Sequence, residues 1–322
     1  MNLKIKRILT IALPLLLGVF LVWYSLSQIS IKKLIDYFQQ ANYTYIILGV
    51  FFGLLSHLSR AYRWRFQLEP MGYNVKLGNS IMAVFATYLI NYTIPRAGEV
   101  ARATILTNYE DVPFEKGFGT IVAERIADMI VMLGIIAITL FLQFDFIYGF
   151  LVEKFDPSKI ILAVAGLSVL LVFFFRYIKK STSKIALKIK SFVNGLVEGA
   201  LSIFKMKKKW AFIFHTLFIW AMYVLMFYVT SFALEQTSNV PFAAILIGFI
   251  AASFSIAATN GGIGSYPEAI VLAFSLFNLP EEPSRAFGWI MWGSQTLLII
   301  IFGGLSLIYL PVFNRKKTSG HN

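Results

Sequence analysis

Two arginines, Arg96 and Arg102, stand within an otherwise apolar stretch of the chain, together with Pro95 and Gly98. Pro95 has no N–H group and Gly98 relaxes the backbone, so we expect a helix to turn or restart here. A helix that begins near Pro95 would point its free N–H groups and the positive end of its dipole towards a cavity. With two permanent cations beside it, this is a candidate binding site for a phosphate group. The alternative is that these charges only pair with acids and cap a hairpin.

Acidic residues close to these arginines could balance their charge. Glu99 lies three residues before Arg102, a spacing that allows an ion pair on one helix. Further along, Glu124 and Asp128 lie four residues apart and share a helix face, with Arg125 beside them. One interpretation is a group that gates or relays charge for the arginines. The other is a set of interfacial ion pairs that fixes helix packing, and both stay open.

A second polar sequence, Thr259–Glu268, interrupts another apolar stretch. Its glycines, Gly261, Gly262 and Gly264, allow close backbone approach and predict a nest of amides for an anion or a lipid carbonyl. Glu268 would be a carboxylate inside the membrane, either paired or protonated. Broken backbone exposes N–H and C=O groups that lipid cannot satisfy. We therefore expect both breaks to be packed in protein or to line a hydrated cavity, and to form the functional site.

The composition places these breaks in an integral membrane protein. The 322 residues are 58% hydrophobic and only 14% charged, with a mean hydropathy of +0.72, whereas soluble domains contain about 25% charged residues. The absence of cysteine excludes disulfides, thiol catalysis and thiolate metal sites. Three scattered histidines suggest no metal centre, and no cofactor is expected. The formal charge of +13 lies beside apolar segments, where it sets orientation, so we expect no nucleic-acid partner.

Six apolar segments approach the roughly 20 residues that cross a bilayer as a helix. They are Ile8–Leu26, Tyr43–Arg60, Phe118–Leu142, Ser158–Tyr177, Trp210–Phe232 and Arg285–Leu310. The first is too long for a signal-peptide core of about 7–15 residues, so we interpret it as an uncleaved span. Two further apolar regions, Gly78–Thr107 and Val240–Phe277, contain the two breaks.

The distribution of charge predicts how these segments are oriented. Arg60 and Arg63 are interpreted as cytoplasmic charges after the second span, residues 145–156 are acidic and therefore external, and residues 176–209 are strongly basic and cytoplasmic. Both termini are then cytoplasmic. Each broken region starts and ends on one side, so the expected fold is all-α, with six full spans and two re-entrant helical hairpins that enter from opposite leaflets.

This order of segments predicts an inverted-topology repeat, a common plan of transporters. Residues 1–142 and 158–322 would be the two halves of a single transmembrane domain. Between them, residues 178–209 form a basic segment in which Lys184–Phe204 has helical amphipathic spacing. It predicts a cytoplasmic helix in the membrane interface that favours anionic lipid, or simply a connector with a solvated face.

The quoted motifs resemble a known family. Pro95-Arg96-Ala97-Gly98-Glu99 with Arg102, Glu124-Arg125 with Asp128, and Gly261-Gly262-Ile263-Gly264 are similar to the flippase-like lysylphosphatidylglycerol synthase transmembrane-domain family. The resemblance covers nearly the whole chain and implies lipid handling without a synthase domain. Two positions depart from the family pattern. Asn260 stands where proline is common, and Pro267 stands where a glutamate is common, with Glu268 one residue later.

We therefore hypothesise a lipid translocator of the bacterial inner membrane that moves a phospholipid or a polyprenyl-linked lipid between leaflets. Its expected partners are membrane lipids, chiefly anionic, and an envelope-lipid synthesis enzyme. Arg96 and Arg102, with Gly98 and the glycines of the second break, would bind the lipid phosphate. Glu99, Glu124, Arg125, Asp128 and Glu268 would balance or gate that charge. The alternatives are a membrane-embedded transferase acting on a lipid carrier and a non-catalytic partner of an envelope enzyme.

Overall fold

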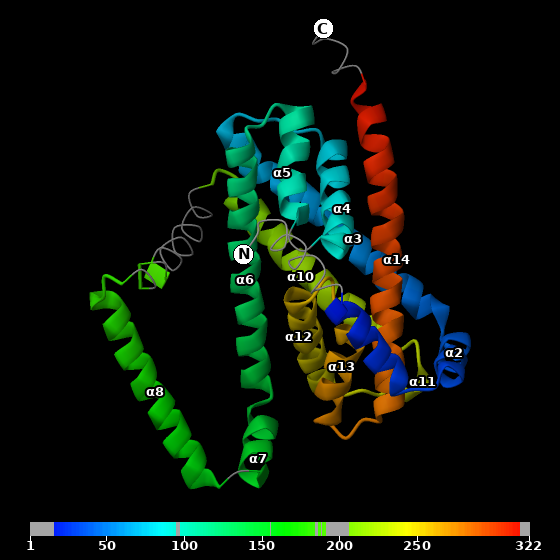
Figure 1. Ribbon diagram of the computed structural model, residues 1–322, viewed down its shortest axis with the longest axis vertical. Coiled ribbons are helices and arrows are strands. Elements are labelled where there is room, and N and C mark those ends of the chain that lie inside the picture. The colour runs from blue at the N-terminus through cyan, green and yellow to red at the C-terminus, as the bar shows by residue number, and fades with distance from the viewer. Residues whose placement is uncertain are drawn as a thin grey trace. The chain divides into compact units, whose positions relative to one another are not determined.

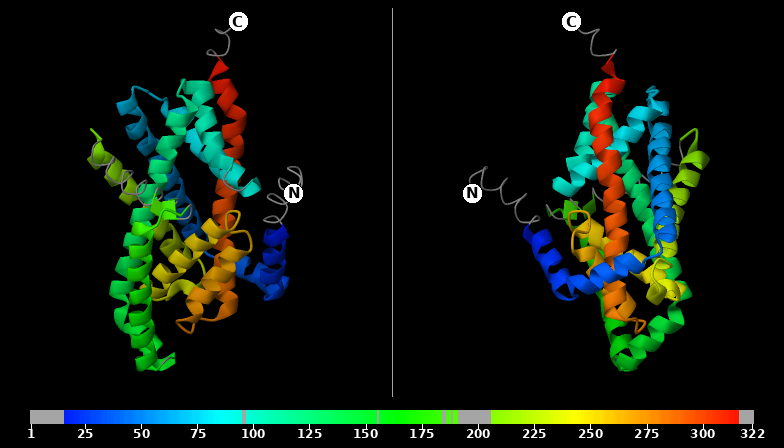
Figure 2. Two further views of the ribbon diagram at one scale, coloured as in Figure 1. Left: turned by 60° about the vertical axis from the view of Figure 1, so that its left-hand side comes forward. Right: turned by 90° about the vertical axis from the view of Figure 1, so that its right-hand side faces the viewer.

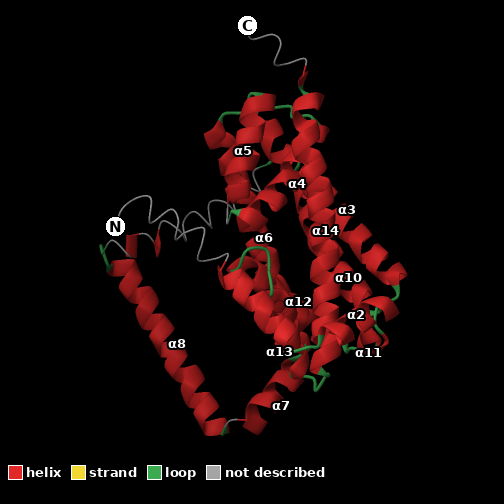
Figure 3. Ribbon diagram, turned by 45° about the vertical axis from the view of Figure 1, so that its right-hand side comes forward, coloured by secondary structure: helices red, strands yellow, loops and turns green. Residues whose placement is uncertain are grey.

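The computed structural model describes residues 16–94, 97–154, 156–183, 186–187, 189–190 and 206–315. These residues form helices joined by turns, and no strand occurs among them (Figure 3). Helices suit a chain this apolar, because they satisfy every backbone N–H and C=O group within one segment. The predicted all-α fold is therefore confirmed.

Four helices in the described part of the chain are long and apolar enough to cross a membrane. They are α3 with the short helix η1 that continues it (Tyr43–Met71), α6 (Phe114–Leu142), α10 (Lys209–Ser231) and α14 (Glu281–Phe313). Each matches a predicted span. The first helix, Leu16–Ser27, and α8, Pro157–Lys180, cover the described parts of two further predicted spans. The count of six full spans remains a prediction.

The remaining described helices are shorter. They are α2 (Ile31–Gln40), α4 (Leu77–Thr93), α5 (Ala97–Glu110), α7 (Phe144–Lys154), α11 (Glu235–Ser238), α12 (Phe242–Ala258) and α13 (Ser265–Ser275). At about 1.5 Å per residue, α4 and α12 are each about 26 Å long and α13 about 17 Å. Each is shorter than the roughly 30 Å hydrocarbon core of a bilayer.

The chain packs as two compact units. One contains the described residues up to Glu124 and those from Trp210 onwards, and the other contains residues 125–209. In the second unit, the Asp156 side chain accepts a hydrogen bond from the N–H of Ser158 and so caps α8. The predicted repeat halves follow a different division and remain a prediction. Most of the predicted amphipathic helix Lys184–Phe204 lies outside the described residues.

In the first unit, two helical hairpins pack along α14, one after the other. The hairpin α4–α5 lies beside the C-terminal half of α14 and the hairpin α12–α13 beside its N-terminal half (Figures 1 and 2). Phe85 of α4 stacks on Phe302 with ring centroids 5.3 Å apart. Phe274 of α13 stacks on Phe287 at 5.8 Å. α14 is thus the common support on which both predicted breaks are placed.

The apolar core of this unit lies among α3, α4, α5 and the beginning of α6. Its fully buried members include Trp64, Leu68, Ala83, Ala86, Ala103, Leu106 and Ile121. Small residues on α4 and α5 let the helices of the first hairpin approach closely. Trp64 of this core contacts Arg102, one of the buried charged side chains described next.

Candidate functional site

Three arginines converge on one carboxylate inside the first unit. Glu124 of α6 accepts two hydrogen bonds from Arg102 of α5, each 3.1 Å long, one to each carboxylate oxygen. Arg60 of α3 donates to Glu124 Oε1 at 2.6 Å, and Nη2 of Arg63 lies 3.3 Å from the same oxygen. All four side chains are at most 3% exposed. We call these four residues the Glu124 cluster.

Aromatic and hydroxyl groups hold the arginines of the Glu124 cluster in place. The guanidinium carbon of Arg102 lies 3.8 Å from the centre of the Trp64 ring, a close cation–π contact. Trp64 in turn donates through Nε1 to Thr120 Oγ1 at 2.8 Å, one turn before Glu124 on α6. Arg63 donates to Thr216 of α10 at 2.7 Å. The cluster therefore connects α3, α5, α6 and α10 through oriented, desolvated contacts.

This arrangement is suited to exchanging one anion for another. A guanidinium fork matches a carboxylate and a phosphate equally well in shape. In this structure the fork of Arg102, a residue predicted to bind phosphate, is engaged by Glu124. Glu124 also contacts Arg60 and Arg63, so its carboxylate does not rely on Arg102 alone for a cationic partner.

The turn of the first hairpin is held by polar contacts to Gly98. Its N–H donates to Asn91 Oδ1 at 2.8 Å, and Thr87 Oγ1 donates to its carbonyl at 3.1 Å. A Cβ at this position would collide with the Thr87 carbonyl oxygen, so close packing of α4 on α5 requires glycine. Pro95 and Arg96 lie outside the described residues. The predicted phosphate site is therefore described only in part.

The other acids and bases predicted around the first break lie on α5 and α6. Glu99 is partly buried in the first turn of α5. Arg125 and Asp128 lie further along α6, in the second unit, and Asp128 is only 6% exposed. The structure joins Glu124 to Arg102, whereas the gating or balancing roles predicted for the other residues remain predictions.

In the second hairpin, the glycine turn is closed by internal hydrogen bonds. Gly261, Gly262 and Gly264 have φ values of +65°, +79° and +70°, a region that favours glycine. The N–H of Gly261 donates to the Thr259 carbonyl at 2.9 Å, and that of Gly262 to Thr259 Oγ1 at 3.1 Å. These two amides, predicted to form an anion nest, are thus satisfied within the turn in this structure.

Glu268 is the centre of a second ion pair, at the start of α13. Arg285 of α14 donates to its two carboxylate oxygens at 2.7 and 3.1 Å, and Ser25 of the first helix donates at 2.6 Å. Trp289 donates to Ser25 at 3.2 Å. Glu268 was expected to be either paired or protonated, and the structure shows an ion pair with Arg285, which is only 3% exposed.

The tips of the two hairpins meet near the middle of α14. Tyr92, at the end of α4, lies so close to Gly261 that a Cβ there would collide with the tyrosine ring. Tyr92 shares a 3.2 Å hydrogen bond with Thr296, and Trp292 donates to the Gly261 carbonyl at 2.8 Å. Two segments about 170 residues apart in sequence are thus joined at one level of the bundle.

Polar atoms without a hydrogen-bond partner occur in this interior. Among the described residues they include His57 Nδ1, Trp220 Nε1, Asn260 Nδ2 and Gln295 Nε2. The His57 ring lies 4.7 Å from that of Tyr88 between α3 and α4. Burying such groups without a partner costs roughly 1–3 kcal/mol each, which favours their meeting water or a polar ligand.

Comparison with known proteins gives the family. Residues 11–304 match the family described as the lysylphosphatidylglycerol synthase TM region. The chain belongs to this family. Over 91% of its length it is 25% identical to the UPF0104 membrane protein MJ1595 of Methanocaldococcus jannaschii, of which it covers 92%. It is also 27% identical over 138 residues to the glycosyltransferase AglD of Haloferax volcanii, but covers only 22% of that protein.

The chain is thus a multi-pass membrane protein of the lysylphosphatidylglycerol synthase TM family. Within it, sequence reasoning missed the buried ion pairs of Arg60, Arg63 and Arg285. Arg60 and Arg63 were interpreted as loop charges that set orientation, but α3 continues to Leu68 and buries both. Their spacing of three residues next to Trp64 places them on neighbouring positions of one helix, and this signal could have identified them.

Proposed function

We propose that the protein moves a phospholipid or a polyprenyl-linked lipid between the leaflets of a membrane. Spontaneous movement is slow because a polar headgroup must enter hydrocarbon, where burying a charge costs several kcal/mol. A protein accelerates it by offering the headgroup polar partners along a path, while the chains stay in lipid. The family membership supports a lipid-related role.

The observation that carries this proposal is the meeting of the hairpin tips at Tyr92 and Gly261. Each hairpin helix is shorter than the hydrocarbon core, and each hairpin packs on one half of α14. This supports two re-entrant hairpins that enter from opposite leaflets, as in inverted-repeat transporters. Both termini would be cytoplasmic, as the charge pattern predicts, and we propose the bacterial inner membrane as the location.

The unpartnered polar atoms near the hairpin tips support a hydrated path there. Lipid supplies no hydrogen bonds, so these buried groups favour internal water or a headgroup. In our proposal the lipid phosphate meets Arg96 and Arg102 and displaces Glu124 from the Arg102 guanidinium. Gly98 and the glycines of the second break admit the headgroup, and Glu268 balances charge at the opposite end.

A translocation assay tests this proposal. Proteoliposomes would carry a fluorescent phospholipid whose outer-leaflet copies are quenched by a membrane-impermeant reductant. Arg102→Gln should slow translocation by about tenfold or more, because it removes charge-assisted hydrogen bonds worth about 1.5–3 kcal/mol. Arg102→Lys keeps the charge without the fork and should give an intermediate rate.

The double variant R102Q/E124Q separates a transport defect from a folding defect. It replaces the bidentate ion pair with two neutral amides, so the cluster loses both a cation and an anion. We expect it to fold, as judged by a monodisperse elution profile, and to remain slow in translocation. A wild-type rate in this variant would exclude Arg102 as the phosphate site.

The likeness to a glycosyltransferase supports one alternative, a transferase that acts on a lipid carrier. The matched region is a minor part of that relative, so the likeness brings no particular active site with it. Purified protein incubated with a polyprenyl phosphate and a nucleotide sugar distinguishes the two functions. Formation of a glycosylated lipid without translocation would favour the transferase.

A further inference from the structure

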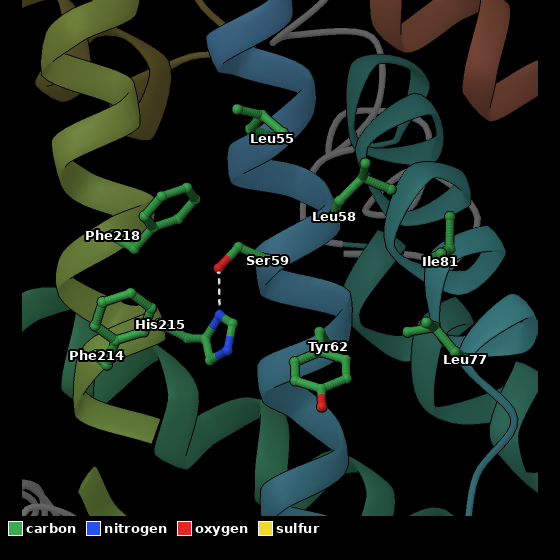
Figure 4. Close-up of a pocket in the computed structure, with 9 residues that line it drawn as sticks. All are labelled: Leu55, Leu58, Ser59, Tyr62, Leu77, Ile81, Phe214, His215 and Phe218. Carbon is green, nitrogen blue, oxygen red and sulfur yellow. Dashed lines mark hydrogen bonds between the residues drawn. The ribbon is translucent and has the colours of Figure 1, made fainter. Parts of the chain in front are cut away.

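A groove opens between α3, α4 and α10, on a part of the first unit that the proposed translocation does not use. Figure 4 shows the side chains that line it: Leu55, Leu58, Ser59, Tyr62, Leu77, Ile81, Phe214, His215 and Phe218. Its volume is about 350 Å³. The four residues from α3 recur at the three- and four-residue spacing of one helix face, so the groove follows the axis of α3.

The groove is apolar except for the Tyr62 hydroxyl and one hydrogen-bonded pair. Ser59 Oγ lies 2.8 Å from Nδ1 of His215, which leaves Nε2 of the imidazole for another partner (Figure 4). The residues next to this pair in sequence, Arg60 and Thr216, belong to or contact the Glu124 cluster. α3 and α10 therefore present the charged cluster on one side and the groove on another.

Residues at one end of the groove are of the types that favour a membrane interface. Trp210 lies one turn before Phe214 on α10 and is 74% exposed, and Lys209 precedes it. Arg65 lies one turn after Tyr62 on α3, with its guanidinium carbon 5.8 Å from the Tyr62 ring. Tryptophan and basic residues are enriched at this level of a bilayer, and basic residues attract anionic headgroups. From there the groove continues inwards to Leu55 and Phe218.

We propose that this groove binds one hydrocarbon chain of an anionic membrane phospholipid. The hydrocarbon chain of the lipid lies along the α3 face towards Leu55. Its ester carbonyl oxygen accepts a hydrogen bond from Nε2–H of His215, and the phosphate lies near Arg65. The apolar lining, the single polar pair and the basic end follow the order of chain, ester and headgroup in such a lipid. This binding site stands independently of translocation, since a protein that binds lipid without moving it would use it equally.

Photo-crosslinking at equilibrium tests this site. The full-length protein would be placed in phosphatidylcholine nanodiscs that contain a small fraction of phosphatidylglycerol with a diazirine in one chain. After illumination, we expect mass spectrometry to find labelled residues concentrated in the α3 segment Leu55–Tyr62 and the α10 segment Phe214–Phe218. The same probe on phosphatidylcholine should label these segments about fivefold less, as expected for one basic residue near the headgroup.

Matched variants make the result decisive. Leu58→Trp fills the groove and should abolish the enriched labelling, while Leu305→Trp, on an exposed position of α14, should leave it unchanged. Arg65→Gln should remove the preference for phosphatidylglycerol, and Arg176→Gln on α8 should not. Should Leu58→Trp fail to elute as a monodisperse protein, Ile81→Trp fills the groove from α4.

Labelling spread evenly over exposed apolar residues, or unchanged in both groove-filling variants, would overturn the proposal. Equal labelling by the phosphatidylglycerol and phosphatidylcholine probes would also overturn it, because the basic end of the groove would then not select an anionic headgroup. Neither result bears on the translocation assay, whose rate depends on Arg102. The failure of this inference and the failure of the proposed function are therefore distinguishable.

Discussion

The two hairpins of the first unit are anchored in different ways. The hairpin α4–α5 is fixed by the Glu124 cluster, in which one fully buried carboxylate receives three guanidiniums from α3 and α5. The hairpin α12–α13 depends on one bidentate pair, Glu268–Arg285, whose carboxylate side chain is 17% exposed. Burial strengthens ionic contacts and raises the cost of breaking them. We therefore expect the second hairpin to be the easier one to displace.

The two turns also require glycine for different reasons. Gly98 is needed because α4 and α5 approach closely, and its neighbours are a backbone carbonyl and Asn91. Gly261 is needed because its φ is positive and because the Tyr92 ring lies against it. One turn is thus fixed by packing within its own hairpin. The other is fixed where the two hairpins meet, so its stability should depend on both.

Of the substitutions that test this difference between the hairpins, removing the Glu124 carboxylate should lower the free energy of unfolding most. Glu124→Gln leaves three buried guanidiniums facing a neutral amide, and breaking a buried ion pair from one side costs about 3–5 kcal/mol. We expect a loss of that size in the free energy of unfolding, measured by steric trapping in bicelles. The double variant R102Q/E124Q should recover part of this loss. If Glu124→Gln is as stable as the wild type, the Glu124 cluster does not anchor the hairpin through its charges.

The junction between the hairpins should be the next most sensitive position. Gly261→Ala places a methyl group against Tyr92 at a positive φ, and the two costs together are about 2–4 kcal/mol. Gly72→Ala is the matched control, because Gly72 also has a positive φ, +88°, but nothing lies near its Cβ position. It should show only the backbone cost of about 1–2 kcal/mol.

A rescue experiment isolates the contact with Tyr92. The substitution Tyr92→Ala removes the ring with which the new methyl group collides. Gly261→Ala should therefore lower the free energy of unfolding less in the Tyr92→Ala protein than in the wild type. A double-mutant cycle of unfolding free energies measures this coupling. If the two substitutions are simply additive, the hairpin tips do not contact each other in solution.

Much of the fold followed from the sequence because hydrophobicity and charge act locally. Apolar length predicted α6, α10 and α14 to within a few residues, and proline and glycine located both breaks. The predicted span ended at Arg60, whereas α3 continues to Leu68 and buries Arg60 and Arg63. An arginine at the end of an apolar run looks the same whether a loop or a longer helix follows.

The pairings within the candidate site were harder to predict. Glu124 was expected to balance the charge of Arg102, and the structure pairs them, but the convergence of Arg60 and Arg63 on the same carboxylate was not predicted. Arg285 pairs with Glu268 across 17 residues and the turn between α13 and α14. Such contacts depend on the angle at which helices pack, and a single sequence carries little information about that angle.

Removing the Glu268 carboxylate should have a smaller effect than the same change at Glu124. Glu268→Gln keeps the side-chain shape and an acceptor for Ser25, while Arg285 retains Glu281 with an N–O distance of 3.7 Å. We expect a loss of about 1–2 kcal/mol, since the carboxylate is partly solvated. Steric trapping under identical conditions compares the two variants directly. A loss equal to that of Glu124→Gln would remove the proposed difference between the hairpins.

The smallest effect is expected at the ion pair between α2 and the start of α14. Lys33 Nζ lies 2.8 Å from Glu282, but the two side chains are 57% and 41% exposed. Exposed pairs are screened by water and salt and contribute little to stability. Lys33→Ala should therefore leave the unfolding free energy within experimental error of the wild type, at low and at high salt. A clear loss that disappears on adding salt would show that α2 helps to hold the N-terminal end of α14, and would add a second anchor beside Glu268.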